Sequence, residues 1–96
     1  MFIIITYDVN TEDKAGRRRL RRVAKLCQNF GQRVQFSVFE CVLEEKDFLK
    51  LKADLASVID EEKDSIRIYF INSADRQKII NFGSKIPRDF EAPLIL

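Results

Sequence analysis

The hydrophobic pattern changes its period along the chain, and each period predicts a different element. Residues 2–8, FIIITYD, form an apolar run rich in β-branched and aromatic side chains, which predicts a central strand buried on both faces. Apolar residues then recur at steps of three and four, which predicts an amphipathic helix packed on the sheet. These residues are Leu20, Val23, Ala24, Cys27 and Phe30. Thr11 or Asp13 is expected to cap this helix, and Gly31 to end it.

The stretch RVQFSVFECVL, residues 33–43, alternates in two phases. The alternation reverses at Val38 and Phe39, which predicts a bulge, a sharp bend or the junction of two strands, although no Gly, Pro or Asn marks a turn. Residues 44–62 have helical periodicity, and SIRIYFI, residues 65–71, predicts another strand. The apolar stripe of this second helix is Phe48, Leu51, Leu55, Val58 and Ile59.

If the segment with the reversal is counted as two strands, the predicted order of elements is β-α-β-β-α-β. This order predicts an α+β, ferredoxin-like fold, in which an antiparallel sheet carries both helices on one face. A chain of 96 residues fits a single domain over residues 1–96. The end is less regular: residues 72–82 predict a short helix or turn, and PLIL, residues 93–96, an extra short strand. We expect residues 73–96 to dock on the partner protomer of a homodimer.

Composition narrows the class of protein. No apolar run reaches the roughly 18 residues needed to cross a membrane, and no signal peptide is apparent, so we expect a cytoplasmic protein without a membrane partner. Cys27 and Cys41 are too few for a disulfide scaffold and are expected to be reduced core residues. The chain has no histidine, which excludes the commonest general base and zinc ligand. Any catalysis must therefore use carboxylates, arginines, hydroxyls or a metal ion.

Positive charge is concentrated in one segment. From Lys14 to Phe39 the chain carries +8 and no acidic residue, whereas the remainder carries −6. The basic side chains fall on the outer face of the first predicted helix, with Arg19 nearer the border. They are Arg17, Arg18, Arg21, Arg22 and Lys25. Such a face can be no more than a solvated surface, but the acids that would pair with it at helical spacing are missing, which favours phosphate binding and nucleic acid as partner.

Asp8 ends the predicted central strand, next to the basic helix. It either caps the following loop, pairs with an arginine, or holds a metal ion. Mg²⁺ prefers oxygen ligands and commonly takes one or two carboxylates together with a substrate phosphate. A homodimer with its two-fold axis near the strand ends would bring Asp8 and its mate together. A metal held by this pair would activate water for attack on a phosphodiester without any histidine.

Three segments together resemble a known family. They are TYDV at the end of the first strand, NFGQRVQFSVFEC after the basic helix, and KDSIRIY in the later strand. They resemble the small CRISPR-associated nuclease that serves as the second core subunit of the spacer-acquisition machinery. The resemblance covers about residues 2–72 and fades in the tail.

This resemblance implies a ferredoxin-like homodimer in which Asp8 faces its mate across the dimer axis and binds Mg²⁺ or Mn²⁺. The family includes metal-dependent endonucleases of DNA or single-stranded RNA, and it bridges pairs of the larger integrase subunit. Positions implicated around the family's site match Tyr7, Arg33, Ser37, Phe39 and either Arg19 or Arg22. From the residues alone, Tyr7 and Phe39 are more often core aromatics, and the Ser37 hydroxyl is placed to serve the bend.

Our interpretation is a metal-dependent endonuclease that acts in spacer acquisition. Asp8, Tyr7, Arg33 and Phe39 are the expected catalytic residues, with Asp8 as the metal ligand. The basic face, Arg19 and Ser37 are expected to bind nucleic acid. The alternative is a catalytically silent DNA-binding scaffold that holds the integrase subunits together. An RNA-recognition module on the same fold is disfavoured, because the Gly- and aromatic-rich motif of that class is missing.

Overall fold

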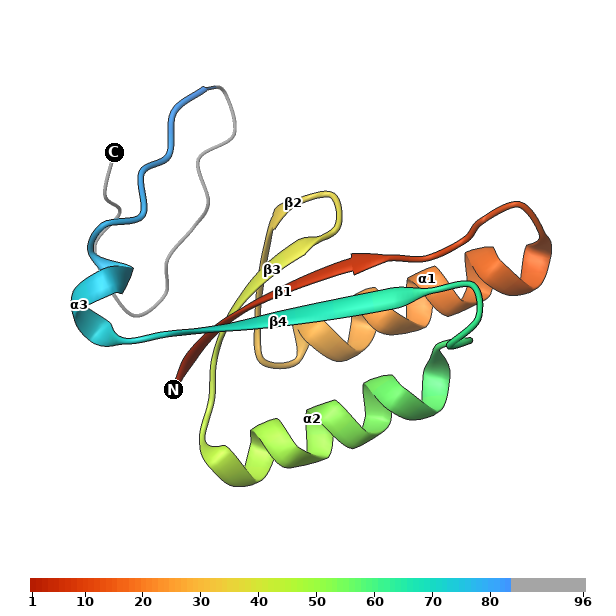
Figure 1. Cartoon of the computed structure of the whole chain (residues 1–96), viewed down its shortest axis with the longest axis horizontal. Coiled ribbons are helices and arrows are strands. Elements are labelled where there is room, and N and C mark those ends of the chain that lie inside the picture. The colour runs from red at the N-terminus through yellow and green to blue at the C-terminus, as the bar shows by residue number, and fades with distance from the viewer. Residues whose placement is uncertain (84–96) are drawn as a thin grey trace.

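The computed structural model describes residues 1–83, which form one antiparallel sheet with the two long helices on one side (Figure 1). The elements are β1 (Phe2–Asp8), α1 (Lys14–Gln28), β2 (Gly31–Gln35), β3 (Val38–Val42), α2 (Glu45–Val58), β4 (Ser65–Ile71) and α3 (Ser73–Arg76). The strand order is β2-β3-β1-β4, and each neighbouring pair is antiparallel. This arrangement confirms the α+β, ferredoxin-like prediction.

Strand β1 is central, but its two faces differ. Ile3, Ile5 and Tyr7 point into the core beneath α1 and α2, because alternate side chains of a strand share a face. On the opposite, open face, Ile4 and Thr6 are only half-buried. The prediction that the strand is buried on both faces is therefore wrong for residues 1–83, where no second layer covers the open face. The short α3 reaches one end of it and holds a guanidinium 4.4 Å from the ring centroid of Phe2.

Helix α1 starts where a side chain caps it. The Asp13 Oδ1 atom accepts a 2.8 Å hydrogen bond from the backbone N–H of Gly16, which selects Asp13 over Thr11 as the cap. The helix ends at Gln28, and Gly31 begins β2 instead of ending the helix. Gly31 has an ordinary backbone conformation, but a Cβ there would collide with the Glu40 carbonyl oxygen. The predicted role of Gly31 is thus wrong: it permits close approach of β3.

The reversed alternation between β2 and β3 is a hairpin. Phe36 and Ser37 form its turn, and the strand pairing shifts register between Arg33 and Gln35. Among the alternatives left open by the sequence, the structure therefore combines a strand junction with a bulge. Neither turn residue has a positive φ, which explains why residues other than Gly and Asn fill the turn.

The core lies between the sheet and the two long helices. The predicted stripe of α2 is confirmed: Phe48, Leu51, Leu55 and Val58 are buried, and Ile59 packs partly against them. Cys27 and Cys41 are free and buried in this core, as expected. Burial raises the pKa of each thiol to about 12. No helix within residues 1–83 is long and apolar enough to span a membrane.

The short helix α3 confirms the prediction for the segment after β4. Its first residues are held by Asn72, whose side-chain oxygen accepts a 2.8 Å hydrogen bond from the backbone N–H of Asp75. The predicted strand at residues 93–96, and most of the segment expected to dock on a partner, lie outside the described residues.

Candidate active site and nucleic-acid interface

Asp8 is the last residue of β1, and its side chain lies on the open face of the sheet. It is exposed, and its Cα is paired across the sheet with that of Ser65 at the start of β4. Within residues 1–83 its carboxylate forms no hydrogen bond and no ion pair, so it neither caps the loop nor neutralises an arginine there. A charged group without a structural partner at the end of a central strand is available to a ligand.

A cation, Arg67, lies on the same open face of the sheet as Asp8. Arg67 lies opposite Thr6, whose hydroxyl donates a 3.4 Å hydrogen bond to the Arg67 carbonyl oxygen. The guanidinium of Arg67 is 5.6 Å from the ring centroid of Tyr69. The sequence analysis missed this residue. The signal was present, because Ser65, Arg67 and Tyr69 are the polar phase of SIRIYFI, and antiparallel pairing puts that phase on the face of Asp8.

Three of the predicted residues form a stack on the other side of β1. The rings of Tyr7 and Phe39 lie 6.2 Å apart, and the Arg33 guanidinium is 5.3 Å from the Phe39 centroid and 5.7 Å from that of Phe36. Burial raises the pKa of Tyr7, and the nearby Arg33 charge partly opposes this rise. Tyr7 and Phe39 are buried, which agrees with the role as core aromatics that the sequence analysis gave as the alternative to a site role.

The turn after β2 connects this stack to Asp8. The Tyr7 hydroxyl lies 3.5 Å from the Phe36 carbonyl oxygen, to which it donates, and the Tyr7 backbone N–H donates a 3.1 Å hydrogen bond to the Ser37 carbonyl oxygen. The backbone of Ser37 therefore holds the turn against the end of β1. No hydrogen bond of the Ser37 hydroxyl occurs within residues 1–83.

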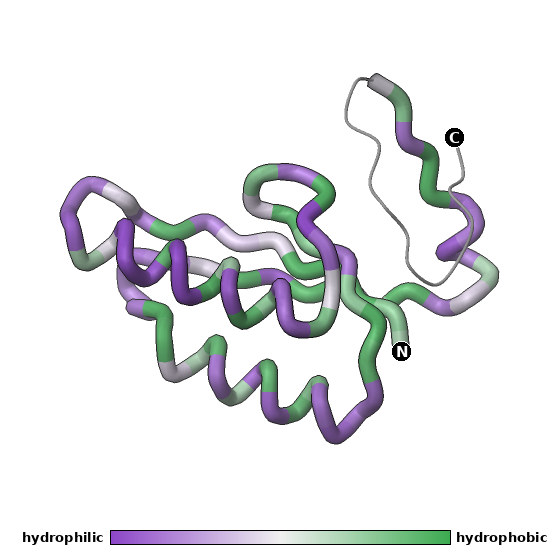
Figure 2. The backbone as a smooth tube through the Cα atoms, turned by 180° about the vertical axis from the view of Figure 1, so that it is seen from behind, coloured by the Kyte–Doolittle hydropathy of each residue, from purple (hydrophilic) through white to green (hydrophobic). Residues whose placement is uncertain are grey.

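The basic face of α1 is exposed as predicted. In Figure 2, hydrophilic positions recur at every turn of this helix, on the side away from the sheet. The exposed cations are Arg17, Arg18, Arg21, Arg22 and Lys25. Arg17 donates a 3.3 Å hydrogen bond to the Thr11 carbonyl oxygen, whereas the other four make no hydrogen bond or ion pair in the described part of the chain.

Arg19 differs from its neighbours, because it pairs with Asp64. Its Nε atom lies 2.7 Å from Asp64 Oδ2, and its Nη2 atom 3.3 Å from Oδ1. The Asp64 side chain is fully buried and also accepts backbone N–H groups of Asn10 and Asp60 at 3.0 and 2.9 Å. Burial raises the pKa of Asp64, but these hydrogen bonds outweigh it and hold the pKa below its usual 3.8. The pair ties α1 to the loops beside Asp8.

In one chain, Asp8 and the basic face point in opposite directions. The helix packs on the sheet through Val23, Ala24 and Cys27, so its exposed face is turned away from the sheet. Asp8 projects from the sheet face that the helices leave open. The structure therefore does not bring the predicted metal ligand and the predicted phosphate-binding arginines onto one surface of a single chain.

The donor set limits how a metal ion can be held. No three acidic or cysteine side chains in residues 1–83 come close enough to share an ion. Asp8 alone is an oxygen ligand of the kind that Mg²⁺ and Mn²⁺ accept, and its carboxylate is exposed and unpartnered. The residues fit a divalent ion if a second carboxylate or a substrate phosphate completes the site.

Comparison with known proteins identifies the family. The family model for the CRISPR associated protein Cas2 matches residues 1–79. The CRISPR-associated endoribonuclease Cas2 of Chlorobaculum tepidum is 53% identical over 96 residues, which is 100% of both chains. The CRISPR-associated endonuclease Cas2 of Halalkalibacterium halodurans is 52% identical over 95 residues, 99% of each chain.

A solved structure agrees with these relatives. The crystal structure of Streptococcus pyogenes Cas2 at pH 6.5 matches with a TM-score of 0.79 and 49% identity, and it covers 86% of this chain and 100% of that one. The resemblance stated from the three sequence segments is thereby confirmed. This chain belongs to the Cas2 family of CRISPR-associated proteins.

Proposed function

We propose that this protein is an endonuclease of CRISPR spacer acquisition that hydrolyses phosphodiester bonds of DNA or RNA and depends on a divalent metal ion. The observation that carries the proposal is the Asp8 carboxylate, exposed at the end of β1 and without a partner in residues 1–83. The names of its relatives, an endoribonuclease and an endonuclease, support the same chemistry.

The active unit in this proposal is a homodimer. One chain offers a single carboxylate, so Asp8 and Asp8 of a second copy would hold Mg²⁺ or Mn²⁺ between them. A divalent ion bound there supplies polarisation of the phosphoryl group and acidification of water. The half-buried Ile4 and Thr6 on the open face support a dimer, because a second sheet would complete their burial.

The chain's own residues then bind and position the substrate. Arg67, on the face of Asp8, is placed to contact a phosphate beside the cleaved bond. The Arg33 guanidinium, fixed by two aromatic rings, is suited to a second phosphate or a base. Tyr7 and Phe39 are buried and act as positioning residues, because they support the turn against the end of β1. The basic face of α1 holds the nucleic-acid backbone farther along.

A second candidate is a non-catalytic DNA-binding scaffold that bridges larger integrase subunits in the acquisition complex. One observation favours it: the basic face and Asp8 point in opposite directions, so α1 can bind duplex DNA without bringing it to the carboxylate. The two candidates differ in whether Asp8 is needed for cleavage or only occupies a surface.

The deciding experiment measures cleavage and binding of single-stranded RNA and double-stranded DNA with Mg²⁺, Mn²⁺ or a chelator. We expect Asp8→Ala to abolish metal-dependent cleavage and to retain folding, dimerisation and binding, since the Asp8 side chain makes no hydrogen bond or ion pair in the described chain. Glu61→Ala, which removes an exposed carboxylate of a turn, is the matched control and is expected to cleave normally. Equal cleavage by all three proteins, or none by the wild type, would favour the scaffold.

A further inference from the structure

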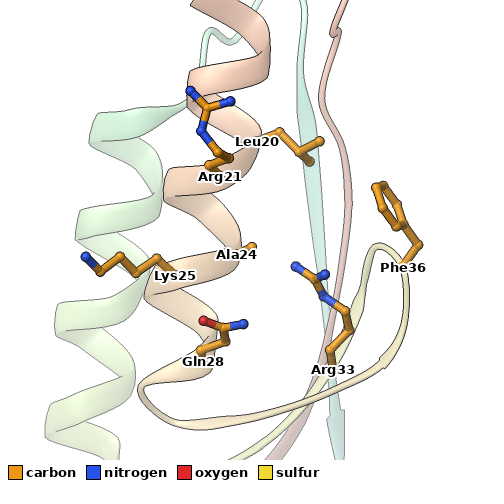
Figure 3. Close-up of a pocket in the computed structure, with 7 residues that line it drawn as sticks. All are labelled: Leu20, Arg21, Ala24, Lys25, Gln28, Arg33 and Phe36. Carbon is orange, nitrogen blue, oxygen red and sulfur yellow. The ribbon is translucent and has the colours of Figure 1, made fainter.

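A groove separates α1 from the hairpin of β2 and β3. The groove is open to solvent and has a volume of about 370 Å³, comparable with small-ligand pockets. Figure 3 shows its two sides: Leu20, Ala24 and Gln28 lie on α1, and Arg33 lies on the hairpin with Phe36 above it at the turn. This groove lies beside the stack of Tyr7, Phe39 and Arg33. Arg33 belongs to both, whereas Tyr7 and Phe39 do not line the groove.

The walls of the groove match a flat, partly apolar ligand. Leu20 and Ala24 form an apolar floor, and Phe36 is 71% exposed although its ring is large and apolar. The planar guanidinium of Arg33 is 5.7 Å from the ring centroid of Phe36 and 5.3 Å from that of Phe39. Aromatic rings and arginine planes are the groups on which unpaired nucleobases stack. The ring of Phe36 is therefore available to a base.

The polar groups around the groove match the rest of a nucleotide. Gln28 faces Arg33 from α1 (Figure 3), and its side-chain amide both donates and accepts, as an edge of a base requires. Arg21 and Lys25 flank the groove on the outer side of α1, without partners in the described chain. None of the lining residues is acidic. Arg21 and Lys25 are thus placed to bind the negatively charged backbone of a nucleic acid, on the side of the groove away from Phe36.

We propose that this groove is a subsite for one unpaired nucleobase of single-stranded nucleic acid. The base stacks on Phe36 and Arg33 over the apolar floor, Gln28 contacts its edge, and Arg21 and Lys25 hold the neighbouring phosphates. This subsite adds a binding site for the substrate to the proposed nuclease function. It rests on that function only for the claim that the bound strand is then cleaved. A base inside a duplex is stacked on its neighbours and cannot enter, so the groove selects single strands.

The position of the turn relates this subsite to Asp8. Phe36 and Ser37 separate the groove from the end of β1, where Ser37 accepts the hydrogen bond from the Tyr7 N–H. A strand that leaves the groove therefore crosses the turn before it reaches the carboxylate. The nucleotide in the groove is not the one that is cleaved; it anchors the strand beside the cleaved bond.

The test compares two single-stranded probes of equal length in the presence of a chelator: an oligothymidine, and an oligomer of abasic deoxyribose phosphates. We expect Phe36→Ala to weaken binding of oligothymidine roughly 5- to 150-fold, from about 1–3 kcal/mol per stacked base and tenfold per 1.4 kcal/mol. Its affinity for the abasic oligomer should not change. Phe36→Tyr, which keeps the ring, should bind like the wild type. Leu49→Ala, which removes an apolar side chain that is 56% exposed on α2, is the matched control.

Two results would overturn the subsite. If Phe36→Ala weakens both probes equally, or neither, no base occupies the groove. If it dissociates a dimer in light scattering, Phe36 is a contact between copies. Because the chelator prevents turnover, the outcome does not depend on cleavage. A protein that never cleaves, yet loses affinity for oligothymidine alone in Phe36→Ala, would refute the nuclease proposal and retain the subsite.

Discussion

Neighbouring arginines of the same helix have opposite environments. Arg19 is mostly buried, with 15% of its side chain exposed, and it forms a two-pronged pair with the fully buried Asp64. Arg18 and Arg22 are exposed and make no hydrogen bond or ion pair within residues 1–83. In the run RRRLRR, one guanidinium thus serves the fold, and its neighbours remain available to a polyanion.

The difference shows that charge alone does not define a binding surface. Asp64 takes hydrogen bonds from α1, from the loop after β1 and from the loop after α2, through Arg19, Asn10 and Asp60. These loops flank the ends of β1 and β4, where Asp8 and Ser65 lie. Arg19, which does not belong to the basic face, therefore holds the loops beside the candidate active site in place through Asp64.

The largest effect is expected from Asp64→Ala. It leaves a guanidinium and two backbone N–H groups without their buried acceptor, so the free energy of unfolding should fall by roughly 3–5 kcal/mol. Urea denaturation followed by circular dichroism measures this loss. Asp54→Ala, which removes a partly exposed carboxylate of α2, is the control and should lower stability far less. Similar losses in both variants would contradict the view that the Asp64 cluster is structural.

Acid should remove part of the same stabilisation. A carboxyl group whose pKa is lower in the folded than in the unfolded protein stabilises the fold above its unfolded pKa, and this is lost as the pH falls through the folded value. The pKa of Asp64 lies below 3.8, so its contribution should be complete at neutral pH and disappear in the acid range below 3.8. Asp64→Asn should lack this component. Parallel acid profiles of stability in Asp64→Asn and wild type would contradict this.

The two roles of the arginines can be distinguished by measuring nucleic-acid binding and stability in the same variants. Arg18→Ala and Arg22→Ala should each remove one phosphate contact, which makes the slope of log K against log salt shallower by roughly 0.7–0.9 and leaves the urea midpoint unchanged. Arg19→Ala should lower the urea midpoint and leave the salt slope unchanged, when measured where the variant is folded. Lys52→Ala, which removes an exposed cation of α2, should change neither. If Arg19→Ala alters the slope, Arg19 also contacts nucleic acid.

The smallest effect is expected from an exposed pair. Lys50 Nζ lies 3.0 Å from Asp54 Oδ2 on α2, with 72% and 40% of the side chains exposed. Water screens such a pair, so Lys50→Ala should leave the urea midpoint unchanged. A loss as large as that of Asp64→Ala would mean that exposure does not separate structural from incidental ion pairs in this protein.

The fold could be predicted because its determinants are local. The apolar run of β1, the cap at Asp13 and the stripe of α2 each depend on neighbours within a few residues. The hairpin could be located but not classified, since its turn needs no positive φ and hence no marker residue. Gly31 was misassigned because its requirement comes from β3, across the sheet.

The candidate site was predictable only in part. Asp8 was identified from its place at the end of an apolar strand, but its face relative to α1 follows from the strand phase in three dimensions. The pair of Arg19 and Asp64 joins residues 45 positions apart, and no helical spacing reveals such a partner. Arg67 was missed for the same reason, since only strand pairing puts it on the face of Asp8.

The buried thiols make this protein convenient for labelling chemistry. Because burial raises the pKa of Cys27 and Cys41 to about 12, both thiols are protonated at neutral pH, and the thiolate is the species that reacts with maleimides and iodoacetamide. A cysteine introduced at an exposed position of α1 such as Ala15 would therefore react alone, and the two native cysteines could stay in place. A fluorophore or spin label placed in this way could follow nucleic acid along α1 in the otherwise unaltered protein.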